Sequence, residues 1–302
     1  MTLANDFDLT ARFIAAEQAK RCLRVLDRRT SRLLMTRVSN GTVVRVQPGY
    51  FARRVYWDTL TLPDRYMHIL RTSRPQDGKA LYKGFAAAFL WGLDLPKECL
   101  QQLKLKDMEA ITYKTPARNL AIVNGFTVTP LAQTLLDCLA ELDFPCGVAL
   151  VDSAIRAYPA FDREMLARQF KAMGIRRRGY QKGLAALENS CSESPHADIS
   201  YLRALAYQLG FTKPYMFSQD GVDMVWDGSD TPAVPANLYG KSERYAHLPA
   251  HERGTVDGSG AIERFLIENG PLLRINARLL QNPEELAALL NRAGVQRRRR
   301  RL

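Results

Sequence analysis

The stretch Thr42-Val43-Val44-Arg45-Val46-Gln47-Pro48-Gly49-Tyr50-Phe51-Ala52-Arg53-Arg54 decides how the first part of this chain folds. It contains two short runs of β-branched and aromatic residues on either side of a Pro-Gly pair. Such runs around such a turn predict a β-hairpin. The hairpin carries three arginines, which place positive charge on a small β wing.

Two helices are expected before this hairpin. Between Leu9 and Leu26, apolar residues recur at three- and four-residue spacings, which is the pattern of one apolar helix stripe. Thr30 and Ser31 offer capping hydroxyls for a short second helix that ends near Asn40-Gly41. A helix, a short helix and a basic β wing together form the outline of a winged helix-turn-helix.

The short helix and the wing have the residue types that bind DNA. A helix fits the major groove, where polar and basic side chains near its N-terminus reach base edges and phosphates. Seven residues of the helix and the wing are expected to contact DNA: Thr30, Ser31, Arg32, Arg37, Arg45, Arg53 and Arg54. The last three would hold backbone phosphates from the wing. A small packing module with a solvated basic face is the alternative.

The positive charge of the chain is concentrated at its two ends. The formal net charge is +12, and residues 1–75 carry 14 lysines and arginines against 6 acidic residues. The run Arg297–Arg301 adds five more positive charges, so the body between the ends is nearly neutral. Basic patches of this kind attract polyanions through counterion release. For the terminal run, a disordered tail that only aids solubility is the alternative.

Length and composition limit the class of protein. At roughly 100–200 residues per domain, 302 residues predict two or three domains. No apolar run approaches the roughly 18–20 residues of a membrane span, and the N-terminus lacks the pattern of a secretory signal. The five cysteines are scattered and form no CxxC pair, so neither a zinc ribbon nor a disulfide framework is expected. A reducing cytoplasm is the predicted location.

The middle of the chain contains four short motifs in a characteristic order. They are the Gly49-Tyr50 pair that follows the turn of the basic wing, a small-residue helix ending in Trp91-Gly92-Leu93, the stretch Val128-Thr129-Pro130 to Asp137, and Ala149-Leu150-Val151-Asp152-Ser153-Ala154-Ile155-Arg156. Over residues 25–160 this pattern resembles the AbiEi-type antitoxins of type IV toxin–antitoxin and abortive-infection systems. The resemblance implies a winged-helix antitoxin that binds double-stranded DNA upstream of its own operon and represses transcription. It also implies a functional partner, a nucleotidyltransferase-like toxin.

In long members of this family the C-terminal segment is similar to very-short-patch-repair endonucleases, a branch of the PD-(D/E)xK fold. In this chain such a domain begins near Cys191. The resemblance places four positions where a nuclease of this kind has its acidic residues and its lysine: Asp198, Asp223, Asn237 and Arg244.

These four positions lack the full chemistry of hydrolysis. Mg²⁺ near a scissile phosphate needs anionic oxygen ligands, and Asn237 has lost the charge. Arg244 cannot give up a proton as a lysine can, and Pro235 weakens the strand that would carry the site. We therefore expect a domain without catalytic residues, metal or cofactor. A displaced acidic ligand such as Glu243 is the alternative.

The sequence predicts an α+β or α/β multidomain protein. Its expected segments are a winged helix-turn-helix at 1–60, an α/β middle domain at 61–160, a helical linker at 161–190, an inactive nuclease-like domain at 191–296 and a basic tail at 297–302. The predicted function is a cytoplasmic, DNA-binding transcriptional autorepressor without a membrane partner. The alternatives are a metal-dependent DNA endonuclease and a module that neutralises a toxin by direct binding.

Overall fold

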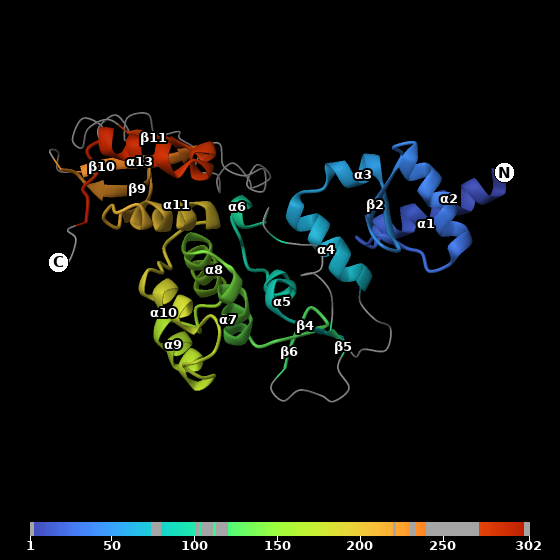
Figure 1. Cartoon of the computed structure of the whole chain (residues 1–302), viewed down its shortest axis with the longest axis horizontal. Helices are drawn as coiled ribbons and strands as arrows, with labels where there is room; N and C mark the ends of the chain where they lie inside the picture. Colours follow the sequence, from blue (N-terminus) through green and yellow to red (C-terminus); the bar gives the residue numbers. More distant parts are fainter. Residues whose placement is uncertain are drawn as a thin grey trace. The chain divides into compact units, whose positions relative to one another are not determined.

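The computed structural model describes residues 3–73, 80–100, 103, 111–112, 120–219, 222–229, 233–239 and 272–298. The chain divides into two units, the first made of Met1–Gly92 with Leu103–Thr134 and the second of Leu93–Gln102 with Leu135–Leu302. Helices dominate, and the described strands form three small sheets (Figure 1). This confirms the α+β class in general terms, whereas the five-segment division stays a prediction.

The first unit begins with a helical and sheet module. Its elements are α1 (Leu3–Gln18), β1 (Leu23–Arg24), α2 (Arg28–Ser39), β2 (Val43–Gln47) and β3 (Tyr50–Arg53). The three strands form an antiparallel sheet in the order β1-β3-β2. The expected hairpin about Pro48-Gly49 is therefore confirmed, and Gly49 has the positive φ of 81° that favours glycine in its turn.

One apolar cluster holds this module together. All five elements contribute to it, through Leu9, Phe13, Leu23, Leu34, Val43 and Phe51, together with Val25. Each helix therefore presents one apolar face to the sheet. The helix α2 contributes Leu34, which is fully buried.

The single helix expected between Leu9 and Leu26 is wrong in its extent. The helix α1 ends at Gln18, and Lys20 has a φ of 50° that ends the helical path. The apolar stripe continues, but its next members lie in a strand. Leu23 pairs with Phe51 of β3, and the buried Cys22 donates its backbone N–H to Thr72 Oγ1 at 2.8 Å.

The expected cap of α2 is also wrong. Asp27 is the N-cap, and its carboxylate accepts the backbone N–H of Thr30 at 2.7 Å. A carboxylate at this place satisfies a free helical N–H and offsets the positive end of the helix dipole. The expected end of the helix is confirmed, because Asn40 is the C-cap and Gly41 follows with a φ of 75°.

The rest of the first unit is a second helix and sheet arrangement. It contains α3 (Arg54–Thr59), α4 (Leu62–Ser73), β4 (Ala80–Tyr82), α5 (Gly84–Leu90), β5 (Ile111–Thr112), β6 (Ala121–Val123) and β7 (Phe126–Val128). The strand order is β5-β4-β7-β6, with β4 and β7 parallel. The expected small-residue helix ended by glycine is confirmed, since α5 is buried and Gly92 follows it with a φ of 72°.

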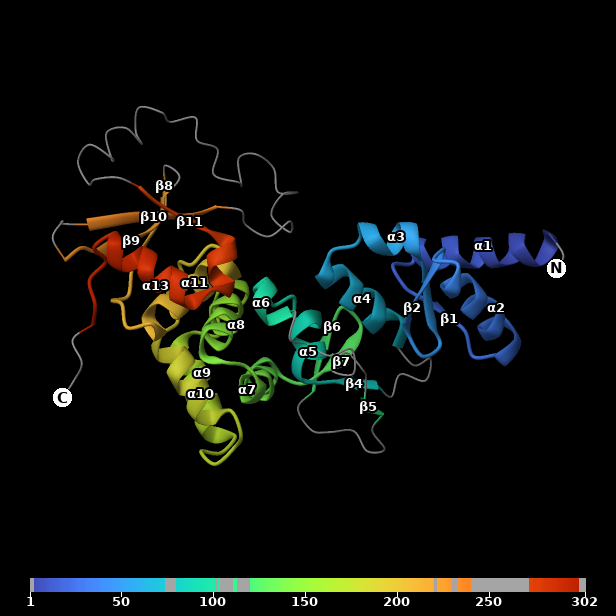
Figure 2. The same ribbon diagram turned by 45° about the horizontal axis from the view of Figure 1, so that its top comes forward.

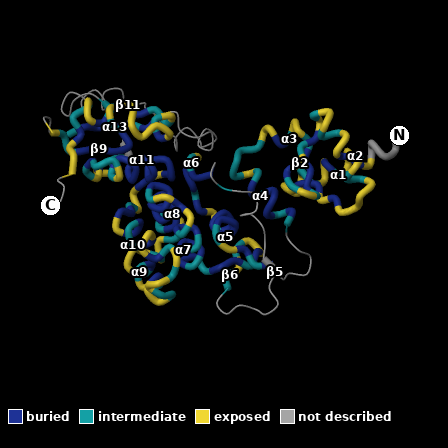
Figure 3. Tube along the Cα trace, in the orientation of Figure 1, coloured by how far each residue is buried: buried dark blue, intermediate teal, exposed yellow. Residues whose placement is uncertain are grey.

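The second unit is mainly helical. Its helices are α6 (Lys97–Leu100), α8 (Phe144–Ala157), α9 (Arg163–Ala172), α10 (Tyr180–Glu188), α11 (Ala197–Gln208), the 3-10 helix η3 (Ala277–Gln281) and α13 (Pro283–Arg292), and most of α7 (Leu131–Glu141) belongs to it. The expected helix after Thr129-Pro130 is thus confirmed as α7. The central helix is α8, which is buried from Pro145 to Ala154 and is dark blue over most of its length in Figure 3.

A four-stranded sheet completes this unit. It contains β8 (Tyr215–Gln219), β9 (Val222–Asp227), β10 (Ala233–Tyr239) and β11 (Leu273–Asn276) in the order β11-β10-β9-β8, and Figure 2 shows α11 and α13 beside it. The strand β10 is interior, yet it contains Pro235. Because β11 pairs with β10 only from Ala236 onward, the proline precedes that pairing and tolerates its missing N–H.

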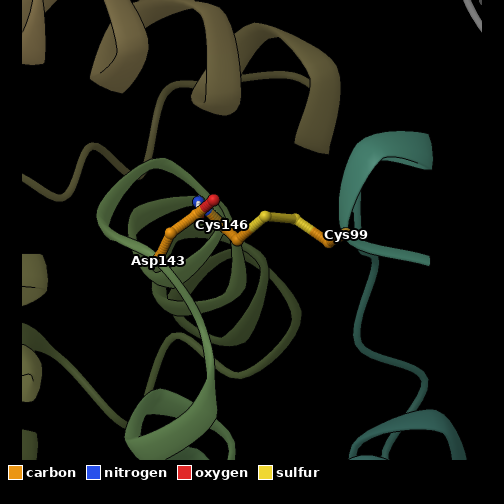
Figure 4. The surroundings of a disulfide bond; sticks show 3 residues. All are labelled: Cys99, Asp143 and Cys146. Carbon is orange, nitrogen blue, oxygen red and sulfur yellow. Dashed lines mark hydrogen bonds between the residues drawn. A yellow bond between two sulfur atoms is a disulfide. The ribbon is translucent and has the colours of Figure 1, made fainter. Parts of the chain in front are cut away.

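A disulfide joins Cys99 of α6 to Cys146 of α8 (Figure 4). The five scattered cysteines had predicted no disulfide framework, and this bond corrects that prediction. The two residues are 47 positions apart and both are buried. The bond ties the segment Leu93–Gln102 to the N-terminal end of α8, where Asp143 caps the helix by accepting the N–H of Cys146. None of the described helices is long and apolar enough to cross a membrane.

Candidate nucleic-acid interface

The helix α2 presents one polar face to solvent. Leu34 fixes the opposite face in the core. Six exposed residues share the outward side: Arg28, Arg29, Arg32, Met35, Thr36 and Ser39. Arg28, Arg32, Met35 and Ser39 follow one another at steps of four, three and four residues, so they form one line along the helix. We call these six residues the α2 face.

The N-terminal end of α2 carries more positive charge than the helix itself favours. Arg28 and Arg29 occupy the first turn, where the helix dipole disfavours cations. No described carboxylate lies within ion-pair distance of Arg28, Arg29 or Arg32. The Asp27 carboxylate beside them is engaged with the helix, and its hydrogen bonds with Thr30 lower its pKa. The result is a face with uncompensated cations and hydrogen-bonding side chains.

The wing is held next to the start of α2. Val25, two residues before the N-cap, donates its backbone N–H to the carbonyl of Gly49 at 2.8 Å. A Cβ at Gly49 would lie 3.2 Å from the Val25 carbonyl oxygen, so glycine also suits this close approach. Arg45 of β2 and Arg24 of β1 are exposed on the same small sheet. The hairpin turn is therefore held beside the N-terminal end of α2.

Five of the seven residues expected to contact DNA divide into an exposed and a half-buried group. Arg32 and Arg45 are exposed, whereas Thr30, Ser31 and Arg37 are half-buried at the sides of α2. The helix begins at Arg28, so Thr30 and Ser31 lie inside its first turn and do not cap it.

The two arginines at the end of the wing already have partners. Arg53 forms an ion pair with Glu17 of α1 and donates Nε–H to Glu17 Oε1 at 2.7 Å. This contact raises the pKa of Arg53. Arg54 donates Nε–H to the carbonyl of Gly41 at 2.7 Å and lies 4.0 Å from Asp58. These guanidinium groups connect elements within the unit, so the positive charge open to a ligand lies mainly on α2 and Arg45.

Sequence reasoning missed five of the six residues of the α2 face. The missing residues are Arg28, Arg29, Met35, Thr36 and Ser39. These residues can be identified from the helical period counted from Leu34, but only once the start of α2 after Asp27 is known. Met35 is 37% exposed, which leaves an apolar side chain among hydrogen-bonding ones. Such a mixture suits a base edge that carries a thymine methyl group.

The positions expected to be remnants of a nuclease site lie in the second unit. Asp198 is in the first turn of α11 and is buried. Asp223 of β9 is also buried, and its carboxylate accepts the backbone N–H of Leu238 at 2.7 Å. Asn237 lies one step beyond the last β9–β10 pair, opposite Asp223. Arg244, Glu243 and the end of the tail at 299–302 lie outside the described residues.

The Asp223 carboxylate therefore takes part in the pairing of two strands. An oxygen that accepts a backbone N–H inside a sheet has less capacity left for a cation. Among the described residues, no three His, Cys, Asp or Glu side chains are grouped so that they could hold a metal ion.

The motif from Ala149 to Arg156 forms a buried polar network. Asp152 is fully buried, and it accepts Arg203 Nη2–H at 2.6 Å and the N–H of Cys191 at 2.7 Å. Burial raises the pKa of Asp152, and the charge of Arg203 opposes this effect.

Two further residues of the motif extend this network. Ser153 Oγ accepts the N–H of Asp94 at 2.6 Å, and Arg156 donates to the carbonyl of Ser194 at 2.8 Å. The polar residues of this motif thus fix the segments that pack on α8.

Part of the basic run is docked against the second unit. Arg297 Nη1 donates to the carbonyl of Leu209 at 3.0 Å, and Arg298 Nη2 donates to the carbonyl of Tyr207 at 2.7 Å. The alternative of a disordered tail therefore does not hold for these two residues.

In comparisons with known proteins, no family model, curated protein or solved structure matches this chain.

Proposed function

We propose that this protein binds double-stranded DNA in a sequence-specific manner through α2 and the adjacent wing. The observation that carries the proposal is the α2 face, a line of arginine, methionine and serine side chains on a helix whose other side is fixed in a core. A short helix with this face fits the major groove, where guanidinium and hydroxyl groups meet base edges. Arg45 and Arg24 would contact phosphates beside it.

The module α1–β1–α2–β2–β3 supports a winged-helix arrangement. In it, α2 is the recognition helix and the hairpin β2–β3 is the wing. One difference from the usual helix-turn-helix is the strand β1 between the two helices. The pairing of β1 with β3 fixes α2 relative to α1, which is the role of the short turn in the usual helix-turn-helix.

We further propose that the DNA lies upstream of the protein's own operon, where binding represses transcription in the manner of an AbiEi-type antitoxin. This part rests on the resemblance over residues 25–160. It brings with it a nucleotidyltransferase-like toxin as functional partner, a cytoplasmic location and a C-terminal unit derived from a very-short-patch-repair-like nuclease without catalysis. The engagement of Asp223 with Leu238 favours this reading over an active endonuclease.

The test is fluorescence anisotropy with a duplex of about 30 base pairs from directly upstream of the start codon, beside a scrambled duplex of equal composition. The proposal predicts preferential binding of the upstream duplex at near-physiological salt, where non-specific phosphate contacts weaken. Equal, steeply salt-dependent binding of both duplexes would contradict it. Incubation of the same protein with supercoiled DNA and Mg²⁺ tests the endonuclease alternative, for which cleavage abolished by Asp223→Ala is the signature.

A further inference from the structure

A second group of cations gathers at the C-terminal end of α11. Lys213 Nζ and Arg298 Cζ lie 5.1 Å and 3.7 Å from the ring centroid of Tyr207, and Arg297 Cζ lies 4.4 Å from that of Phe211. All three cations are exposed. We call Lys213, Arg297, Arg298 and the exposed Arg163 the α11 cluster.

Each member of the cluster is held in place by a backbone carbonyl. Arg298 and Arg297 bind the carbonyls of Tyr207 and Leu209 as described above. Lys213 donates to the carbonyl of Glu188 at 3.2 Å, and Arg163 donates to that of Ser190 at 2.7 Å. An arginine has five N–H donors, and these bonds use few of them. The remaining donors belong to side chains whose positions are already fixed by stacking and hydrogen bonds.

Capping of the C-terminal carbonyls of α11 explains the position of one or two of these cations, but not the presence of all of them. The C-terminal carbonyls of a helix favour a nearby cation. The helix α7 has such a cap in Lys182, which donates to the carbonyls of Ala140 and Leu142 at 3.2 Å and 2.8 Å. At the end of α11 several cations share one small surface, where they repel one another. Burial, and then the charge of the nearby Arg203, lower the pKa of Lys213, with smaller contributions from Arg163 and Arg298, while Glu188 opposes the shift.

We propose that the α11 cluster is a second DNA contact surface, which binds backbone phosphates of a duplex without reading its sequence. Guanidinium groups match the geometry of phosphate oxygens, and an anion relieves the repulsion among the gathered cations. The aromatic rings cover one side of each stacked cation and leave the polar edges for the ligand.

This surface is independent of the proposed function, which requires only the α2 face. It would act on any duplex, and it would give the second unit a role in affinity. The appropriate probe is therefore a scrambled duplex of about 50 base pairs, bound to the full chain across a salt series.

The test compares the variant Lys213→Gln/Arg298→Gln with the wild type. Because each phosphate contact contributes about 0.9 to the slope of log K against log salt, the slope should become shallower by about 1–2. Lys182→Gln is the matched control, since it removes a cation that caps a helix of the same unit. It should leave the slope unchanged. Lys213→Arg/Arg298→Lys keeps both charges and should restore the slope.

A slope and affinity equal to the wild type in the Gln variant would overturn the proposal, and the cluster would then only cap α11. Thermal unfolding of each variant separates this outcome from a failure to fold. If the double Gln variant unfolds, the single variant Lys213→Gln decides: a slope shallower by about 1 supports the proposal, and a slope equal to the wild type contradicts it. Preferential binding of the upstream duplex is a separate result. Its absence would contradict the proposed function and would not affect the proposal for the α11 cluster.

Discussion

Arg32 of α2 and Arg203 of α11 are the same residue type in opposite situations. Arg32 is exposed and has no described carboxylate within ion-pair distance, whereas Arg203 is 4% exposed and binds the carboxylate of Asp152 and the carbonyl of Asn189. A buried cation must be paired, because isolated charge is strongly disfavoured in the interior. An exposed cation without an ion-pair partner contributes little to folding. The contrast teaches that a buried arginine such as Arg203 holds the fold, whereas an exposed one such as Arg32 is available to a ligand.

The largest expected effect comes from replacing the buried arginine of this comparison, Arg203. Arg203→Leu should lower the free energy of unfolding by about 3–5 kcal/mol, because it leaves the Asp152 carboxylate buried without its cation. Urea denaturation followed by circular dichroism measures the change. The control is Asp152→Leu/Arg203→Leu, which removes both charges and should be less destabilised than the single variant. A single variant within about 1 kcal/mol of wild type would show that the pair does not hold α8 against α11.

The next prediction compares the buried and the exposed side of α2 by their effects on stability. Leu34→Ala should cost about 2–5 kcal/mol, because it leaves a cavity in the cluster that holds all five elements of the module. Arg32→Ala should stay within about 0.5 kcal/mol of wild type, as exposed substitutions usually do. The same denaturation experiment measures both. An Arg32→Ala variant as unstable as Leu34→Ala would mean that the α2 face is structural.

The disulfide gives a third test, which concerns a bond between two segments of the second unit. Reduction should lower the stability of this unit by about 2–4 kcal/mol, because the bond closes a long loop that the unfolded chain must otherwise order. Thermal unfolding with and without reductant measures the shift. The variant Cys99→Ala/Cys146→Ala should be insensitive to reductant. If it responds as the wild type does, the effect of the reductant does not come from this bond.

The smallest effect concerns the pH dependence of the first unit. His68 is buried, and its ring nitrogens bond the Asp64 carbonyl and the Tyr56 hydroxyl, each at 2.7 Å. Burial lowers the pKa of His68 below its usual value of about 6.5, while its hydrogen bond to Asp64 opposes the shift. The unfolded chain then binds a proton more readily, so stability should fall as the pH drops below about 6.5. Urea unfolding between neutral and mildly acidic pH measures the trend, and His68→Gln should flatten it. An unchanged slope in that variant would assign the trend to other groups.

Local patterns allowed part of the fold to be predicted. The hairpin at Pro48-Gly49, the end of α2 at Asn40-Gly41 and the helix after Thr129-Pro130 depend on neighbouring residues, and all three are confirmed. The strand β1 was missed because its two residues become a strand only by pairing with β3. Without β1, the start of α2 at Asp27 could not be placed.

The candidate site likewise contains features that local patterns predict and features that they do not. The exposure of Arg32 follows from the period of one helix and could be predicted. The engagement of Arg53 depends on Glu17, which lies 36 residues away in the sequence. The disulfide depends on two cysteines 47 residues apart, and the docking of Arg298 on Tyr207 spans 91 residues. Contacts over such distances are set by tertiary packing, which local patterns do not contain.

The central claim is that α2 reads the DNA sequence. The most direct measurement is the ratio of affinities for the upstream duplex and its scrambled counterpart, in wild type and in Arg32→Ala. A contact from an arginine to a base is worth about 1–3 kcal/mol of discrimination, so the ratio should fall by roughly 5- to 150-fold. Arg54→Ala is the matched control, because it removes an arginine of the same unit whose guanidinium group donates to the carbonyl of Gly41. It should change both affinities together and keep the ratio. A ratio in Arg32→Ala equal to that of the wild type would contradict the claim.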